Sequence, residues 1–211
     1  MKWLTESRLV LIALALTGVV DLLAILIWGK TLAWDAENLS LYTFFPVLGL
    51  LAFSTMWSQY VMGTLKKLSA LPAPRLDPYF NYSGLTVTTL IILHPSLLLW
   101  QLWRDGLGLP PTSYYNYVAP TLKWALLLGV VSFFIFMSFE LRHRYRQRRW
   151  WKYIDHAQDV AIVAIYFHAF KLGSHVQIAW FYPLWLFYGV TLAAVLLYKY
   201  YGHYQRRFNE T

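Results

Sequence analysis

The sequence contains no cysteine and few charged residues. The lack of cysteine excludes disulfides, iron–sulfur clusters, thiolate-bound metals and covalently attached c-type haem within this chain. Charged residues make up 13% of the 211 residues, against roughly 25% in soluble domains. A metal or cofactor would therefore be held by histidine, carboxylate or backbone groups.

Apolar residues take the place of the missing charge. Hydrophobic residues make up 58% and aromatic residues 19% of the chain, and apolar runs of about 20 residues recur, the length that crosses a bilayer core. We therefore expect an all-α, polytopic membrane protein, with residues 1–211 forming a single transmembrane domain in a lipid bilayer. The expected spans are residues 9–28, 41–62, 85–103, 118–139, 156–172 and 178–201. The fifth is the least apolar, because Asp159 and His168 interrupt it.

The basic residues predict the orientation of this six-helix bundle. Six spans place 14 of the 18 lysines and arginines on the side that carries both termini. The positive-inside rule then predicts cytoplasmic N- and C-termini in a plasma membrane of the bacterial inner-membrane type. The basic run at residues 142–149 is interpreted as a topology determinant rather than a docking patch for an acidic partner or an anionic flavin. Nucleic acid is not an expected partner.

Aromatic residues gather near the ends of the expected spans, which is typical of interfacial belts. Trp100, Trp103 and Trp185 are expected in the belt at the outer interface.

Two histidines, His94 and His168, lie deep inside the third and fifth spans. Each is about ten residues from the cytoplasmic end of its span, which corresponds to about 15 Å of helix. Ionisable groups inside a membrane usually mark functional sites, and histidine is the commonest axial ligand of haem iron. A purely structural hydrogen bond across helices is the alternative, but the matched depth favours ligation. The remaining histidines are expected to be solvated: His143, His156, His175 and His203.

Asp21 is a third ionisable group, half-way along the first span. It either pairs with a polar neighbour or takes part in proton movement, and the sequence does not choose between these roles.

Three short segments carry a family resemblance. Residues 93–100 (LHPSLLLW), 151–156 (WKYIDH) and 167–173 (FHAFKLG) resemble the ferric reductase-like transmembrane domain. That family includes the membrane parts of ferric reductases and NADPH oxidases and, more distantly, the haem-binding subunits of bacterial methionine sulfoxide reductase systems. The likeness covers about residues 40–200.

The resemblance implies one haem b rather than the two stacked haems usual in the family. His94 and His168 match the outer ligand pair, so they are the expected ligands of the haem iron. The inner pair would fall near Phe80 and Asp155, and neither is histidine; His156 lies one residue from the expected position. About 20 Å of bilayer would then separate the haem from the cytoplasm, which calls for a flavin or quinone supplied by, or shared with, a partner.

We therefore expect a membrane electron-transfer protein that resembles a b-type cytochrome. No glycine-rich dinucleotide motif follows the sixth span, so flavin or nicotinamide domains are expected on a separate electron-donor protein. The chain is either an enzyme in its own right or the membrane subunit of an oxidoreductase. The competing hypothesis is a haem-free transporter, assembly factor or structural subunit. A transporter should contain internal repeats, and the sequence shows no convincing one.

Overall fold

The structure, a computed structural model, describes residues 5–35, 37, 39–70, 73–138, 147–178 and 180–209. These residues form helices and connecting turns, with no strand among them, so the all-α prediction is confirmed. The α-helices are α1 (Glu6–Thr31), α2 (Leu41–Ser69), α3 (Leu76–Arg104), α4 (Thr112–Tyr117), α5 (Lys123–Met137), α7 (Trp151–Leu172) and α8 (Phe181–Asn209). Short 3₁₀ helices occupy Pro120–Leu122 and Ser174–Gln177.

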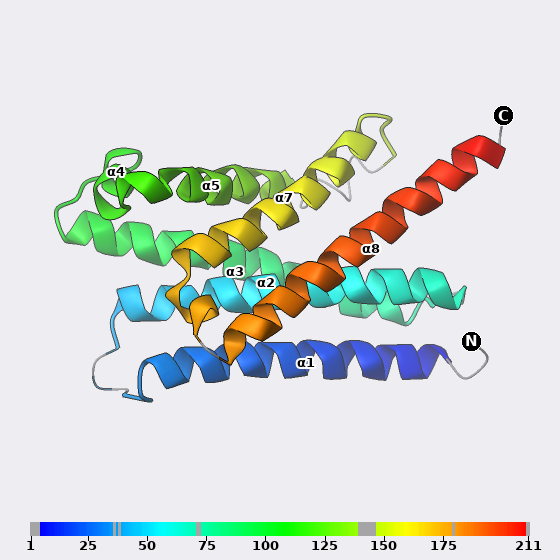
Figure 1. The fold of residues 1–211 in the computed structure, drawn as a ribbon, viewed down its shortest axis with the longest axis horizontal. Helices are drawn as coiled ribbons and strands as arrows, with labels where there is room; N and C mark the ends of the chain where they lie inside the picture. Colours follow the sequence, from blue (N-terminus) through cyan, green and yellow to red (C-terminus); the bar gives the residue numbers. More distant parts are fainter. Residues whose placement is uncertain are drawn as a thin grey trace.

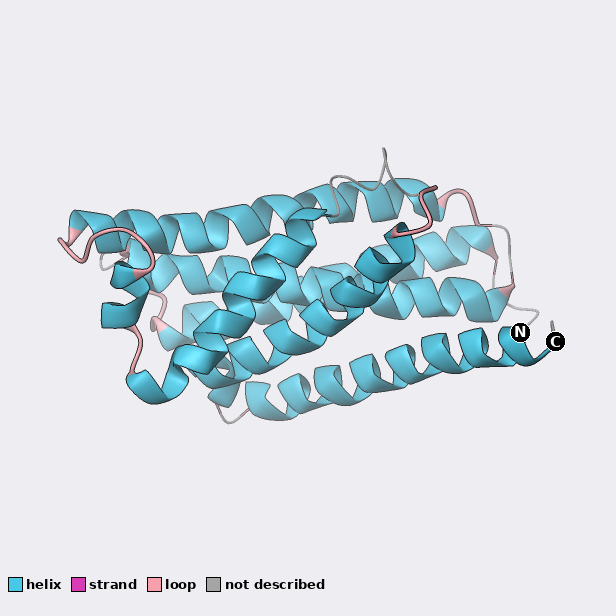
Figure 2. Ribbon diagram, turned by 90° about the horizontal axis from the view of Figure 1, so that it is seen from above, coloured by secondary structure: helices cyan, strands magenta, loops and turns pink. Residues whose placement is uncertain are grey.

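The six long helices alternate in direction, and α7 and α8 are inclined to the other four (Figure 1). Both chain termini lie at one end of the bundle, which we call the terminal end; the start of α3 and the start of α7 lie there too (Figure 1). The opposite end carries α4, the start of α2 and the start of α5, and we call it the α4 end. The view from above shows the same division (Figure 2).

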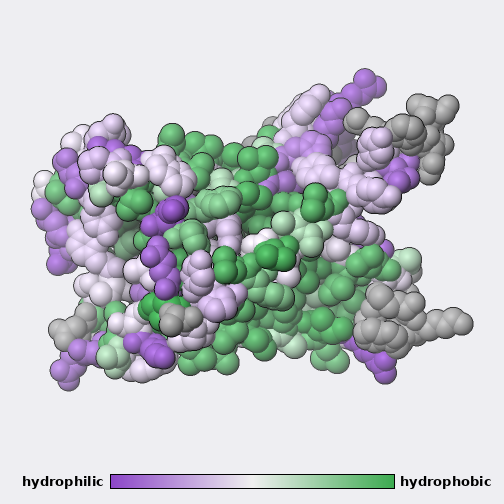
Figure 3. Space-filling view, in the orientation of Figure 1, coloured by the Kyte–Doolittle hydropathy of each residue, from purple (hydrophilic) through white to green (hydrophobic). Residues whose placement is uncertain are grey.

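On the face shown in Figure 3, apolar residues cover most of the middle of the molecule and hydrophilic residues gather toward both ends. Five segments are long and apolar enough to cross a membrane: Glu6–Thr31, Leu41–Ser69, Leu76–Arg104, Pro120–Met137 and Phe181–Gly202. Helix α7 has 22 residues, about 33 Å at 1.5 Å per residue, but its ionisable residues lower its hydropathy. The described chain is thus a multi-pass membrane protein with five clearly apolar spans and a sixth helix of spanning length.

Two helices extend further than their apolar runs predict. Helix α2 continues to Ser69 and α3 begins at Leu76, because helix continues beyond the hydrocarbon into the interface. There Lys66 and Asp77 form an ion pair of 3.0 Å between the two helices.

The expected fourth span starts later than predicted. Val118 is extended, and helix begins at Pro120, a residue suited to a first helical position. The expected end of that span at residue 139 and most of the basic run 142–149 lie outside the described residues.

The main core joins α2 and α8 through aromatic side chains, and aliphatic residues of α1 pack against it. The rings of Phe53 and Trp185 are 4.5 Å apart, and those of Trp57 and Tyr188 are 4.6 Å apart. Trp185 is 0% exposed, so its prediction as an interfacial residue is wrong: it faces α2 rather than the bilayer surface. Trp100 and Trp103 are exposed, as expected for a belt.

A buried ion pair joins α7 to α2 and α8 nearer the terminal end. The carboxylate of Asp159 is 4% exposed and lies 2.6 Å from the Lys199 ammonium. The hydroxyls of Tyr60 and Tyr200 also donate to it, at 3.0 and 2.9 Å. A buried carboxylate is stable only when its oxygens are paired in this way, so the residue that weakens the hydropathy of α7 has a structural explanation.

We expect Lys199→Met to destabilise the protein by about 3 kcal/mol, because it leaves a buried carboxylate without its cation. Adding Asp159→Asn should recover most of the loss, since the remaining amide is neutral. Unfolding in detergent, followed by tryptophan fluorescence, measures both effects. The control is Lys66→Met in the exposed pair with Asp77, where the expected cost is below about 1 kcal/mol; equal losses at the two lysines would refute the assignment.

Candidate cofactor site

A cavity of about 970 Å³ opens between α2, α3, α5 and α7 toward the α4 end. Its wall is mainly apolar and aromatic, with Phe53 from α2 and Phe133 from α5 among its residues. His94 from α3 and His168 from α7 both line it. The structure therefore brings together the two histidines that the sequence singled out, which are 74 positions apart.

His94 is fixed by helix α2. Its Nδ1 lies 2.8 Å from the carbonyl oxygen of Phe45, and its ring lies against Gly49. A carbonyl only accepts hydrogen bonds, so Nδ1 carries the proton and donates it. The neutral ring then presents Nε2 as a free lone pair, the form in which imidazole binds a metal.

His168 has the same arrangement with helix α5. Its Nδ1 lies 2.8 Å from the carbonyl oxygen of Ala125, and its ring lies against Gly129. In both cases the glycine comes four residues after the carbonyl, one helical turn along the same face. The α2–α3 hairpin and the α5–α7 hairpin thus share the same local arrangement of a carbonyl, a glycine and a histidine. No convincing repeat is visible in the sequence.

Glycine is required at both contacts for space. A Cβ atom on Gly49 would lie 2.9 Å from Cε1 of His94, and one on Gly129 would lie 2.5 Å from Cε1 of His168. Both distances are too short for carbon atoms in van der Waals contact. The sequence reasoning missed these glycines and the two carbonyls. The only signal available was a glycine in an apolar run, which has many other causes.

Polar groups gather at the part of the cavity wall nearest α4. The wall includes Lys123, Tyr114 and Tyr115 at the α4 end and, on the 3₁₀ helix that follows α7, His175. The Lys123 ammonium lies 3.4 Å from the centre of the Tyr115 ring. His175 was expected to be solvated, but it is half-buried, its Nδ1 has no hydrogen-bond partner among the described residues, and burial lowers its pKa.

Phe80 and Asp155, which stand where the resemblance would require inner histidines, make other contacts. Phe80 packs against a separate cluster at the terminal end, and Asp155 accepts a hydrogen bond of 2.9 Å from Trp151. His156 is exposed and its Nδ1 lies 3.1 Å from the Tyr200 hydroxyl. Among the described residues, no group of three or more histidine and acidic side chains is placed to hold a metal ion. The two positions where the resemblance would require inner histidines are thus held by Phe80 and Asp155, each with contacts of its own.

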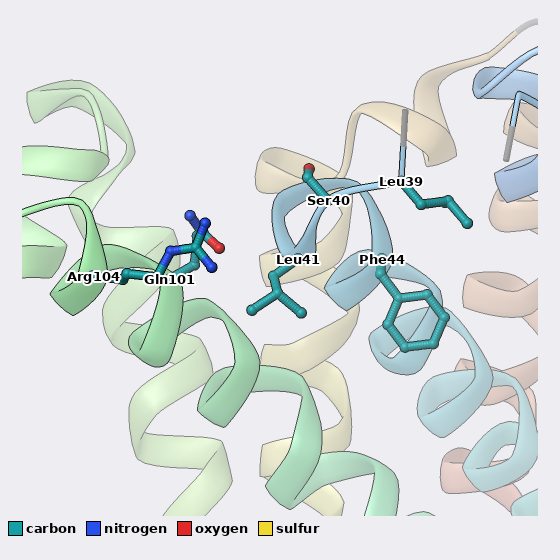
Figure 4. Close-up of a pocket in the computed structure, with 6 residues that line it drawn as sticks. All are labelled: Leu39, Ser40, Leu41, Phe44, Gln101 and Arg104. Atoms are coloured by element: carbon teal, nitrogen blue, oxygen red, sulfur yellow. The ribbon is translucent and has the colours of Figure 1, made fainter. Parts of the chain in front are cut away.

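A smaller pocket of about 420 Å³ lies at the α4 end, between the start of α2 and the end of α3. Figure 4 shows Arg104 and Gln101 on one side of it and Leu41 and Phe44 on the other. Beside it the Tyr42 hydroxyl donates to the exposed carboxylate of Asp105 at 2.6 Å, and this bond lowers the pKa of Asp105. The pocket contains neither candidate histidine, so the larger cavity is the candidate site.

Comparisons with known protein families, curated proteins and solved structures find no match. The likeness to the ferric reductase-like domain thus stays a prediction, and the case for function depends on the cavity.

We expect Gly129→Ala to displace the His168 ring and to destabilise the protein by about 1–3 kcal/mol, the usual cost of overpacking. Gly49→Ala should act in the same direction on His94, with a smaller effect because its contact is looser. Thermal unfolding in detergent measures the change. Gly63→Ala, on α2 with open space around it, is the control and should be neutral or stabilising. Equal stability of all three variants would contradict the close contact.

Proposed function

We propose that this chain is a membrane electron-transfer protein of the b-type cytochrome kind, which binds one haem b between His94 and His168. One observation carries the proposal: both imidazoles line one cavity, each with Nδ1 held by a backbone carbonyl and Nε2 left free. Two such nitrogens would supply two histidine ligands to a haem iron. The structural alternative accounts for the two Nδ1 bonds, and the placement of both rings on one cavity favours ligation.

The residues around the cavity fit such a group. Its volume of about 970 Å³ lies at the upper end of the roughly 300–1,000 Å³ typical of small-molecule sites, as a large macrocycle requires. Gly49 and Gly129 keep the histidine rings close to the helix backbones. Lys123 at the α4 side would hold a carboxylate of a haem.

When bound, haem supplies one-electron redox chemistry. The chain's own contribution would be to hold two neutral imidazoles as ligands, to exclude water with apolar walls and to place the Lys123 ammonium at the α4 side. The low dielectric of this environment tunes the potential. The chain would act as the membrane subunit of an oxidoreductase, with ferric iron, oxygen or a partner protein as the final acceptor.

The proposed orientation has six spans, with α7 as the fifth, and both termini in the cytoplasm of a bacterial-type plasma membrane. The α4 end then faces outward, and the haem lies in the outer half of the bilayer. About 20 Å of bilayer, estimated at 1.5 Å per residue, would separate it from the cytoplasm. Electrons from inside would arrive through a flavin or quinol from a separate donor.

The proposal predicts a coloured protein. Purified with ample haem supplied during expression, it should give a six-coordinate, low-spin b-type spectrum that changes on reduction with dithionite. His94→Ala and His168→Ala should each abolish that spectrum, because neither imidazole alone completes the ligand set. His156→Ala, which removes an exposed histidine outside the cavity, is the matched control and should retain it. A colourless protein would favour the haem-free alternative and refute the proposal.

The orientation predicts which single cysteines react from outside. Because the chain has no cysteine, Asn116→Cys and Gln177→Cys should react with a membrane-impermeant maleimide on intact cells. Arg148→Cys should react only after permeabilisation, since it precedes α7 on the opposite side. The unmodified chain is the blank. Labelling of Arg148→Cys and Gln177→Cys from the same side would show that α7 does not cross the membrane.

A further inference from the structure

A second polar region lies in the middle of the bundle, away from the cavity histidines. Asp21, near the middle of α1, is half-buried, and the Thr55 hydroxyl on α2 lies 3.2 Å from both of its carboxylate oxygens. No lysine, arginine or histidine of the described chain forms an ion pair with it. An unpaired carboxylate in a bilayer is strongly disfavoured in its charged form, so this geometry favours a neutral, protonated side chain.

Two fully buried hydroxyls lie close to this carboxyl group. Ser54 and Tyr188 are both 0% exposed, and their hydroxyls have no complete hydrogen bond among the described residues. They lie beside each other, and Tyr188 is close enough to Asp21 to interact with its charge. Buried hydroxyls are rarely left without partners. Their proximity marks a polar site between α1, α2 and α8.

Three further hydroxyls lead from this site toward the terminal end. Thr17 lies 2.8 Å from both Ser58 and Tyr79, and Ser58 lies 3.1 Å from Tyr79. Thr17 is one helical turn from Asp21 along α1, and Ser58 is one turn from Thr55 along α2. Tyr79 is the fourth residue of α3, within about one turn of its start. Each hydroxyl can both donate and accept a proton, so the three form a hydrogen-bonded cluster one helical turn from the Asp21–Thr55 pair, and Ser58 also donates to the Thr55 backbone carbonyl at 2.8 Å.

We propose that Asp21 is an intramembrane proton-binding site, reached from the terminal end through Tyr79, Thr17 and Ser58. A proton from water at that end binds the Asp21 carboxylate as an O–H group and leaves by the same route, so no bond other than O–H forms or breaks. Among the described residues, the titratable group near Asp21 is Tyr188 from α8, and Tyr79 from α3 belongs to the hydroxyl cluster one turn away. From α2, the Thr55 hydroxyl contacts the carboxylate.

The Asp21 site is also placed to respond to a change of charge in the cavity. This part of the inference rests on the proposed function. Ala52 and Phe53 of α2 line the cavity, while the next two residues, Ser54 and Thr55, belong to the Asp21 site. One helix therefore separates the two sites. An electron added in the cavity would make the potential at Asp21 more negative and favour its protonation. The midpoint potential should then fall as pH rises, by at most about 59 mV per pH unit for a one-electron couple.

Infrared spectroscopy tests the proton site without any cofactor. The protein in lipid vesicles should show a carboxylic acid C=O band that shifts in D₂O and is absent from Asp21→Asn. Tyr79→Phe should keep the band but slow its shift after transfer to D₂O at least tenfold, because the entry to the route is lost. The matched control is Ser132→Ala, which removes a buried hydroxyl that donates to Ala161 between α5 and α7; it should change neither.

Each outcome decides the proposal. A missing band, or a band that survives in Asp21→Asn, would overturn it, including the case in which an ionised Asp21 holds a sodium ion. An unchanged D₂O rate in Tyr79→Phe would overturn the route. A colourless protein that keeps the band would refute the proposed haem and leave the proton site standing. A haem protein whose potential has the same pH dependence in wild type and Asp21→Asn would overturn the coupling.

Discussion

The hydrogen bond from a histidine Nδ1 to a backbone carbonyl of the preceding long helix is the interaction on which the site depends. It occurs twice, from His94 to Phe45 and from His168 to Ala125, at 2.8 Å each. In a low-dielectric interior such a bond is strong, and an unpaired donor would be costly. The bond therefore fixes the tautomer, the ring orientation and the approach of the two helices at once. The glycine one turn beyond each carbonyl makes that approach sterically feasible.

The sequence predicts the parts of the structure that follow from hydropathy and depth. Apolar runs located the long helices, and the matched depth of His94 and His168 indicated a shared site. The carbonyl partners were out of reach, because the contacts join residues 49 and 43 positions apart in uniformly apolar segments. His175 and Trp185 were misplaced for a related reason. Nearness to a span end says little about whether a side chain faces lipid, water or another helix.

The hydrogen bonding of polar side chains differs between the two halves of the bundle. At the α4 side the histidines border a cavity and keep one nitrogen free. Toward the terminal end polar groups satisfy one another, as in the Asp159–Lys199 pair with its two tyrosines and in the Thr17–Ser58–Tyr79 cluster. This contrast agrees with Phe80 and Asp155 standing where a second histidine pair would be needed. The cavity with the two histidines thus extends from the α4 side as far as Met56, near the middle of α2.

The two histidines belong to two separate hairpins, α2–α3 and α5–α7, and each hairpin completes its own half of the site. The Tyr60–Asp159 hydrogen bond already joins the hairpins nearer the terminal end, and a ligand that binds both Nε2 atoms would add a second link at the cavity. Such a ligand adds to stability by mass action, in proportion to the logarithm of its supply. Under the proposed function, cells short of cofactor would hold a population that lacks this second link. Because proteases remove loosely packed states first, cofactor supply would then set how much of this protein the membrane retains.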